Sequence, residues 1–457
     1  MQTFEDDADD TEDAEDYADD ADAEDYADAV EFPVPVAGAS LPVEVVGQRV
    51  REPRDMFDWE RSEARADLSV FVRHMNDVAK RYPAAATARR RRHPRPRPVD
   101  DNVDRAMAVL RTVGKWAIKQ CEPAGQDDLP EAAAERFCHF HSQLRADGRC
   151  LLDRTYGGRG RAEYRDVMLP AYLERSFGDP VTMAYGPAHE LSFCAFLVSL
   201  FKLHHLTWAD EPFVVTVIFD KYLDLVDYVI RSYQLYPSSS EYGGNLGNWC
   251  LSGYQFVGFL WGSAQLAGSC GDGDGDGSAP DSRPSLSSSP TAVMSDADAC
   301  RRHRDEYVFA KCMDAVYRRA GNDVPLWYHS YQLWNLTALP RWDRVNGCLM
   351  AAFQRDVLGR FEVVRQLAFC ELFKFAQNVR PPGMSFYDIV PAMPPSDTAV
   401  SPTVTDVLSY DDDDDDDNDE DEDDEKRIIE YGEIEDGEMV EGGTGDVETF
   451  EDEGFLL

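Results

Sequence analysis

Closely spaced cysteine and histidine side chains are the first residues of this sequence that could do chemistry, by holding a metal ion. Cys138, His139, His141 and Cys150 offer thiolate and imidazole ligands in and after the segment FCHFH. A structural zinc site needs such ligands to converge, usually from two paired halves of the chain. On a helix these side chains would point in different directions, and no second pair follows them. We therefore expect ordinary core and surface residues here, and no metal site.

Alternating aspartates in the segment GDGDGDG are the second candidate, because they resemble the start of a calcium-binding loop. Asp272, Asp274 and Asp276 would converge on the ion, and Gly277 would permit the sharp bend. The twelfth position of such a loop is a bidentate glutamate. Here it is Arg283, so the sequence favours a flexible linker.

Candidate catalytic groups are few. His204 and His205 lie at a joint between two apolar segments, with no neighbouring residue that would make either a general base. The segment YGGRGR at 156–161 is a single Arg-Gly box that a turn explains equally well. The sequence contains no phosphate-binding loop, nucleophile elbow or kinase signature. We therefore predict a protein without enzymatic activity and without a cofactor.

The charge of the chain is concentrated at its two ends. Residues 1–32 contain 16 acidic and no basic residues, and residues 411–457 contain 25 acidic residues against Lys426 and Arg427. The formal net charge of −42 therefore leaves only −3 for residues 33–410. Such acidic segments repel themselves and have little apolar surface to bury, so we predict disordered tails. They favour basic proteins as partners and make direct nucleic-acid binding improbable.

A cluster of four arginines, Arg89, Arg90, Arg91 and Arg92, lies in the proline-broken segment RRRRHPRPRP. We predict a nuclear-import signal bound by an import receptor, because such a cluster in a flexible linker is accessible. A nucleic-acid patch, an internal partner for the acidic tails and a plain solvated linker are the alternatives. One cluster without interleaved aromatic residues makes a poor nucleic-acid interface.

The C-terminal segment DVETFEDEGFLL mixes acidic residues with apolar ones. Phe450, Phe455, Leu456 and Leu457 give it the composition of an acidic-hydrophobic activation segment. A solvated tail without a specific partner is the alternative.

Cysteine usage and hydropathy indicate the compartment. The ten cysteines are irregularly spaced, and no apolar signal segment begins the chain, so we expect reduced thiols in an intracellular protein, nuclear and in part cytoplasmic. Residues 242–271 carry no charge and could be considered as a membrane span. Their Ser, Gln, Asn and Gly content favours a buried core helix, and we predict no membrane association.

Helical periodicity dominates the rest of the chain, and strand-like alternation of comparable strength is lacking, so the predicted fold class is all-α. Thr207 or Asp210 is expected to cap a central helix over 213–233, with Glu211 and Pro212 in its first turn. The expected organisation is a disordered tail and linker at 1–53, an isolated helix at 54–83, a basic linker at 84–100, a helical extension at 101–180, a helical domain at 181–380 with a flexible insertion at 268–299, and a disordered tail at 381–457.

The central helices resemble a cyclin box. The segment HHLTWADEPFVVTVIFDKYLDL is similar to the end of the first and the whole of the second cyclin helix, including the triplet Asp220, Lys221 and Tyr222. The joint LFKLHHLTWADEPF is also similar to that of the neuronal activators of a cyclin-dependent kinase. WCLSGYQFVGFL, with Gly253, resembles the third helix, although it lacks the glutamate that cyclins have there. The segment WDRVNGCLMAAFQRDVLGRFEVVRQLAFCELF resembles the fifth helix. The resemblance covers residues 187–267 and 303–379.

The cyclin resemblance implies a non-catalytic regulatory subunit that binds and activates a protein kinase catalytic subunit by favouring its active conformer. The residues that it implies for kinase binding are Phe201, Lys202, Leu206, Asp220 and Tyr222. The alternative is a transcriptional or viral regulator in which a helical scaffold carries the acidic-hydrophobic tail.

Overall fold

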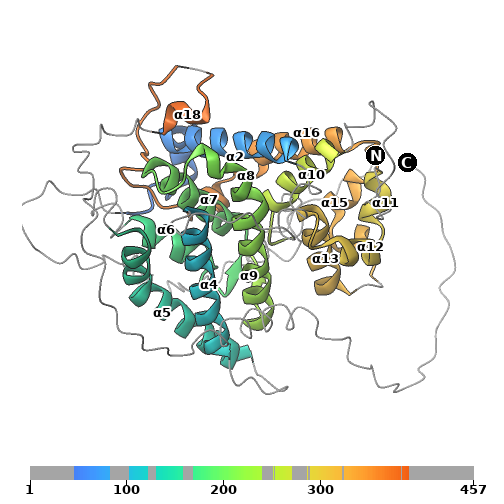
Figure 1. Ribbon diagram of the computed structural model, residues 1–457, viewed down its shortest axis with the longest axis horizontal. Helices are drawn as coiled ribbons and strands as arrows, with labels where there is room; N and C mark the ends of the chain where they lie inside the picture. The colour runs from blue at the N-terminus through green and yellow to red at the C-terminus, as the bar shows by residue number, and fades with distance from the viewer. Residues whose placement is uncertain are drawn as a thin grey trace, which may run out of the picture. The chain divides into compact units, whose positions relative to one another are not determined.

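The structure of the chain, a computed structural model, describes residues 46–82, 102–121, 130–157, 168–238, 251, 253–269, 286, 289–321, 324–381 and 383–390. All of them fall in one structural unit, which begins at Glu44. They are mainly helical, which confirms the predicted all-α fold class (Figure 1).

The first part of this unit contains the helices that precede the most apolar segment of the chain. They are the short 3₁₀ turn η1 (Pro53–Asp55), α1 (Met56–Glu60), α2 (Glu63–Arg81), α4 (Asn102–Cys121), α5 (Pro130–Tyr156) and α6 (Leu169–Arg175). Ser62 caps α2, because its hydroxyl accepts a hydrogen bond from the backbone N–H of Arg65 at 3.1 Å.

The central part contains α7, α9 and α10, which are largely buried. The elements here are β1 (Ala184–Tyr185), α7 (Pro187–Lys202), η3 (Trp208–Asp210), α8 (Glu211–Phe213), the π-helical turn η4 (Val214–Ile218), α9 (Phe219–Ser232), β2 (Tyr236–Pro237) and α10 (Val257–Ser269). Every residue of α7 from Pro187 to Phe201 is buried. The two short strands pair in parallel, with Ala184 opposite Tyr236.

The predicted cap in the joint between α7 and α9 forms, but on the 3₁₀ turn η3 and not on the central helix. Asp210 accepts hydrogen bonds from the backbone N–H and the hydroxyl of Thr207 at 2.8 and 2.9 Å, and this pair begins η3. The segment expected as one helix over 213–233 instead passes through the π-helical turn η4 before α9 begins. The Thr216 hydroxyl donates a hydrogen bond to the Pro212 carbonyl within this turn.

The last part completes the core around α10. It contains α11 (Pro290–Met294), α12 (Ala297–His303), α13 (Val308–Ala320), α14 (Leu326–His329), α15 (Tyr331–Leu336), α16 (Trp342–Ala352), the π-helical turn η6 (Phe353–Val357), α17 (Phe361–Val364) and α18 (Phe386–Ile389). Helix α10 packs against α2, α13 and α16. Pro290, Val293 and Met294 of α11 are buried, so this end of the predicted insertion at 268–299 is part of the fold.

Helix α2, for which we predicted an isolated helix at 54–83, packs against the central helices α7 and α10 (Figure 1). The indole N–H of Trp261 on α10 donates to the Val72 carbonyl at 3.1 Å. The amide of Asn346 on α16 donates to the Asn76 side-chain oxygen at 2.8 Å. The apolar stripe of α2 therefore finds its partner far away in the sequence, which local periodicity cannot indicate.

Residues 372–381 and 383–390, which we call the C-terminal strap, run back over α2. Backbone N–H groups of Glu63 and Ala64 donate to the carbonyls of Ala376 and Lys374 at 2.9 and 3.0 Å. Phe386 on α18 is 2% exposed, and its ring lies 5.3 Å from that of Phe71 on α2. The described part of the predicted tail at 381–457 is therefore folded as far as residue 390, because its aromatic side chain is buried.

The structure also bears on two further predictions, that the chain has no membrane span and that its cysteines are reduced. Among the described residues, no helix is both long and apolar enough to cross a membrane. All eight described cysteines are free thiols.

Candidate functional site

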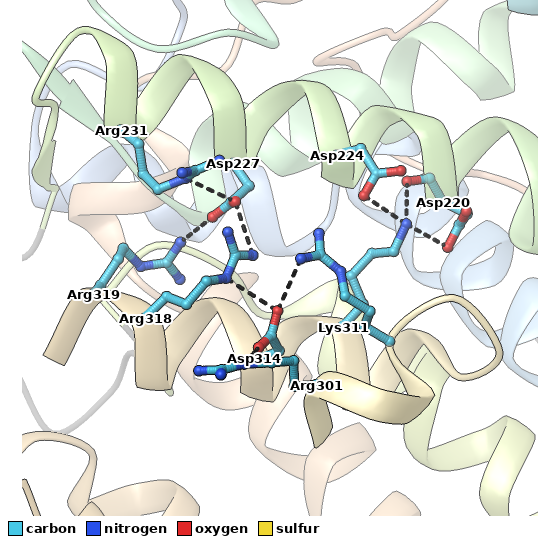
Figure 2. A network of polar contacts seen from close by, with 10 residues as sticks. Asp220, Asp224, Asp227, Arg231, Arg301, Lys311, Asp314, Arg318 and Arg319 are labelled. Atoms are coloured by element: carbon cyan, nitrogen blue, oxygen red, sulfur yellow. Dashed lines mark hydrogen bonds and ion pairs between the residues drawn. The ribbon is translucent and has the colours of Figure 1, made fainter. Parts of the chain in front are cut away.

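Oppositely charged residues gather between α9 and α12–α13 and form what we call the charged cluster (Figure 2). It consists of Asp220, Asp224, Asp227, Arg231, Arg301, Arg304, Lys311, Asp314, Arg318 and Arg319. The aspartates of α9 are spaced four and three residues apart, which places them on one face of the helix. The same spacing relates the charges of α13, so the two stripes face each other.

Lys311 lies at one end of the charged cluster. Its ammonium group is 2.6 Å from an Asp224 oxygen and 3.0 Å from an Asp220 oxygen. The Lys311 and Asp220 side chains are 5% and 9% exposed, so this contact is largely removed from water. A buried lysine is favourable only when carboxylates compensate its charge, and here two of them do.

Asp227 lies at the other end, where three arginines surround it. Its two oxygens lie 2.9 to 3.1 Å from nitrogen atoms of Arg231, Arg318 and Arg319. Burial alone raises the pKa of this carboxyl, but the positive charges of these arginines outweigh burial and hold the pKa below its ordinary value. Asp227 is therefore ionised at neutral pH.

Asp314 extends the Asp227 end of the charged cluster. Its carboxylate is 3.0 Å from Arg318 and 3.2 Å from Arg304. Six cationic and four acidic side chains make up the charged cluster, so its formal net charge is +2. The folded core thus concentrates positive charge at one place, although the whole chain is strongly acidic.

A small cavity of about 10 Å³ adjoins the charged cluster. It is lined by Leu223, Asp224, Asp227, Gln255, Arg304, Lys311, Cys312, Ala315 and Arg318. This volume is about enough for a single water molecule. Cys312 is the thiol at its wall, and burial raises the pKa of this thiol far above its ordinary value, so it is not a reactive thiolate. The arrangement fixes α9 against α13 and provides no activated nucleophile among its residues.

A second buried charge, Glu190 on α7, holds the start of α10. Its carboxylate accepts hydrogen bonds from the backbone N–H groups of Phe256 and Val257 at 2.7 Å and of Gly258 at 3.1 Å. A carboxylate at this position satisfies the unpaired N–H groups of the helix and complements its dipole. Burial nevertheless raises the pKa of Glu190 to about 7. Its role is to join two core helices.

The residues predicted for kinase binding lie inside the protein. Phe201, Leu206 and Tyr222 are each at most 2% exposed. The Tyr222 hydroxyl lies 2.8 Å from the Tyr185 hydroxyl and donates to the Ser176 carbonyl at 2.9 Å. These side chains are core residues and offer no surface to a partner.

The two charged residues of that prediction are also occupied internally. Lys202 contacts Asp67 on α2 and the Leu372 carbonyl of the C-terminal strap, each at 2.5 Å. Asp220 pairs with Lys311 in the charged cluster. Lys202 therefore fastens the strap to the core and is not free for a kinase.

The metal-ligand candidates do not converge. Cys138 and Cys150 are exposed, whereas His141 is buried against the rings of Phe137 and Phe140. Burial lowers the pKa of His141 to about 3, so it is neutral. In the part of the chain that the structure describes, no group of three or more potential ligands could hold a metal ion.

Other predicted sites lie outside the described residues. They are the import cluster Arg89, Arg90, Arg91 and Arg92, the tail residues Phe450, Phe455, Leu456 and Leu457, and the aspartates of GDGDGDG. The predictions for the import cluster and for the disorder of the tails stay predictions.

Sequence reasoning missed the charged cluster and Glu190. A usable signal existed for the first, because Asp220, Asp224 and Asp227 recur in a largely apolar segment at spacings that share one helix face. Glu190 likewise is the only charged residue of α7 before Lys202, which indicates an internal partner.

Comparison with known protein families identifies a relationship over most of this fold. Residues 46–375 match the family model of the phosphotyrosyl phosphate activator (PTPA) protein. A serine/threonine-protein phosphatase 2A activator of Drosophila melanogaster is 33% identical over 210 residues, which are 46% of this chain and 46% of that protein. A serine/threonine-protein phosphatase 2A activator 2 of Cryptococcus neoformans is 25% identical over 319 residues, 69% of this chain and 73% of that protein. The matched part thus spans about half the length of the Drosophila relative.

A solved structure has the same fold. The crystal structure of the PP2A phosphatase activator Ypa1 superposes with a TM-score of 0.56 and 20% sequence identity, covering 74% of this chain and 96% of that chain. At this identity the likeness concerns the fold alone.

These comparisons correct the interpretation of the sequence. The resemblance to cyclins is wrong, and so are the kinase regulation and the kinase partner that it implied, because the relatives are named as phosphatase activators. The alternative, a transcriptional or viral regulator, is wrong for the same reason. The apolar spacing that suggested a cyclin box is common to buried helices of many all-α folds. The family match, in contrast, extends over 330 residues and includes α2 and α4, which lie outside the cyclin-like region, so this chain belongs to the phosphotyrosyl phosphate activator (PTPA) family.

Proposed function

We propose that this chain binds serine/threonine-protein phosphatase 2A and activates it as a regulatory protein. The observation that carries this proposal is the match of residues 46–375 to a family of activators. The names of the Drosophila and Cryptococcus relatives support it.

The proposed mechanism is selection of an active conformer. A regulatory protein that binds the active form of an enzyme more tightly than the inactive form raises the population of the active form. This mechanism needs a rigid binding surface and no reacting group. The ion pairs of the charged cluster and the Glu190 contacts with α10 support such rigidity, because they join helices from distant parts of the sequence.

An activation assay tests the proposal. Purified phosphatase 2A of low basal activity is mixed with the full chain, and hydrolysis of a phosphotyrosyl and a phosphoseryl peptide is followed. We expect faster release of phosphate from at least one peptide. The chain alone and the heat-denatured chain are the controls. The proposal fails if the native chain neither binds the phosphatase nor changes its rate.

The dose dependence of activation separates a binding regulator from a catalyst. If the chain acts by binding, activation rises until the chain and the phosphatase are present in equal amounts, and it reverses on dilution. Full, lasting activation by a small fraction of one equivalent would show that the chain acts catalytically and would contradict the proposed mechanism.

We also propose nuclear import through Arg89, Arg90, Arg91 and Arg92, for which the support is the composition of this segment. A fluorescent fusion of the full chain should accumulate in the nucleus, and replacement of the four arginines by alanine should abolish this accumulation. Equal distribution of both fusions would contradict the import signal.

A further inference from the structure

Four exposed aromatic side chains on α14 and α15 form what we call the aromatic ridge. They are Trp327, Tyr328, Tyr331 and Trp334, with 55%, 73%, 54% and 43% of their surface exposed. The rings form two pairs, one on each helix, with centroids 6.0 Å apart for Trp327 and Tyr328 and 5.8 Å apart for Tyr331 and Trp334. Ten residues thus expose four aromatic rings, a density that ordinary surface composition does not explain.

Packing of the fold does not require these rings, because other side chains of the same helices supply the buried face. Leu326 and Leu333 are 6% and 0% exposed. The backbone N–H groups of Ser330 and Trp334 donate to the carbonyls of Leu326 and Ser330 at 2.8 and 3.0 Å, which joins the two helices. The Thr291 hydroxyl of α11 donates to the Thr337 carbonyl at 2.6 Å. The aromatic ridge is therefore presented on a fixed support.

The aromatic ridge lies in a stretch without charge. Residues 324–340 contain no Asp, Glu, Lys or Arg, although 29% of the chain is charged. His329 is half-buried, and burial lowers its pKa, so it is neutral at pH 7. An acidic tail of this chain would lose hydration here without gaining a countercharge. The composition of the aromatic ridge fits an apolar surface of another protein molecule.

The area of the aromatic ridge distinguishes a second copy of this chain from a different protein. At these exposed fractions, the four aromatic side chains together present roughly 400 to 500 Å² of solvent-accessible surface. Permanent homodimers bury upwards of about 1,000 Å² on each subunit, whereas the energetic centre of a transient interface is a small group of Trp and Tyr side chains. The aromatic ridge has the size and composition of the second kind.

We propose that the aromatic ridge is the surface through which this chain contacts phosphatase 2A. This inference rests on the proposed function and adds to it the residues that bind. The partner surface is apolar and uncharged, and it receives the rings of Trp327 and Tyr331 at the centre of the interface.

Binding measurements with the full chain test this inference. The double variant Trp327→Ala/Tyr331→Ala should bind phosphatase 2A about 30-fold more weakly, as expected for the loss of aromatic anchors. Tyr236→Ala is the matched control, since Tyr236 is 56% exposed and lies on β2, which is not part of the aromatic ridge. It should bind within about twofold of the wild type, as surface substitutions outside an interface do.

A second variant distinguishes a loss of binding from a loss of folding. Tyr328→Glu places a charge at the most exposed ring of the aromatic ridge, where the fold gains little from the side chain. It should keep the urea-unfolding midpoint of the wild type and still bind the phosphatase about tenfold or more weakly, because a carboxylate would be desolvated in an apolar contact.

The outcomes separate this inference from the proposed function. If the wild-type chain does not bind phosphatase 2A, both proposals fail together. If the wild type binds and the folded ridge variants bind equally well, only the contact surface is wrong. If the ridge variants instead change the chain's sedimentation from dimer to monomer and leave phosphatase binding intact, the aromatic ridge is a contact between copies and this inference is overturned.

Discussion

Burial and hydrogen bonding have opposite effects on the pKa of the Glu190 carboxyl. Three backbone N–H groups at the start of α10 favour its ionised form, yet the surrounding core raises its pKa to about 7. Asp227 shows the opposite balance, because three arginines overcome the effect of burial and lower its pKa. The protonation of each buried carboxyl is thus set by whether its partners are full charges or backbone dipoles.

The raised pKa of Glu190 predicts a pH-dependent stability. An unfolded glutamate loses its proton near pH 4.3, about as usual for this side chain, whereas the folded one keeps it up to about pH 7. Between these values the folded state binds more protons, so the free energy of unfolding falls as pH rises, by on the order of 3 kcal/mol, and then levels off. Urea unfolding is measured for the wild type and for Glu190→Gln from pH 5 to pH 8. The difference between their free energies of unfolding should change with pH by this amount. A difference independent of pH would contradict the raised pKa.

Removal of the negative charge of Asp227 should destabilise the fold. Asp227→Asn leaves three arginine side chains without their shared carboxylate, and we expect a loss of about 3 to 5 kcal/mol in the free energy of unfolding. Asp343→Asn is the control, because Asp343 forms an ion pair with Arg341 in which both side chains are more than half exposed. Its substitution should leave the urea midpoint unchanged. Equal effects of the two substitutions would show that the charged cluster does not hold α9 to α13.

At the scale of elements, α10 is the helix that the rest of the core surrounds. It packs against α2, α13 and α16, and Glu190 of α7 caps its start. The two helices approach closely at Gly262, where an added Cβ atom would lie 2.3 Å from the backbone nitrogen of Phe309. A glycine at this position lets the two helix backbones come together.

Substitution of Gly262 tests this approach. Gly262→Ala forces α10 and α13 apart, and we expect a loss of about 1 to 3 kcal/mol in the free energy of unfolding. Gly347→Ala on the exposed face of α16 is the matched control, because an added Cβ atom meets nothing within 4 Å there. It should stabilise the chain by about 0.5 to 1 kcal/mol through helix propensity. A stabilising effect of both substitutions would mean that α10 and α13 are not in close contact.

At the scale of the whole molecule, the exposure of the cysteines distinguishes the surface of the fold from its core. Cys138, Cys150 and Cys348 are exposed, whereas the other described cysteines are buried, namely Cys121, Cys194, Cys300, Cys312 and Cys370. Burial raises the pKa of each of these five thiols, which further lowers their reactivity.

Thiol labelling of the native full chain should therefore divide the described cysteines into two groups. Peptides that contain the three exposed cysteines should be modified at least about tenfold faster than those with the five buried ones, and the difference should vanish in denaturant. Mass spectrometry of the labelled peptides provides the measurement. Rapid labelling of Cys312 in the native chain would indicate that the helices around the charged cluster open.

The candidate sites were partly visible in the sequence. Thr207 and Asp210 do form a local cap, because capping depends on residues a few positions apart, but it begins η3 and not the central helix for which it was predicted. The kinase-binding residues were misplaced, since Lys202 and Tyr222 look like surface groups by type but contact Asp67 and Tyr185 in the core. The aromatic ridge could have been noticed from its aromatic content, but helical spacing alone does not tell an exposed ring from a buried one.

The sequence by itself determined the helical class, the positions of most helices and the uneven distribution of charge, because helix formation and charge patterning depend on residues close in the chain. Tertiary structure alone decided which helices meet. It brought α2 and the C-terminal strap onto the central helices, paired Asp227 with Arg318 and Arg319, and left Trp327 and Tyr331 exposed. These outcomes follow from burial and charge compensation between residues far apart in the sequence, which no local pattern encodes.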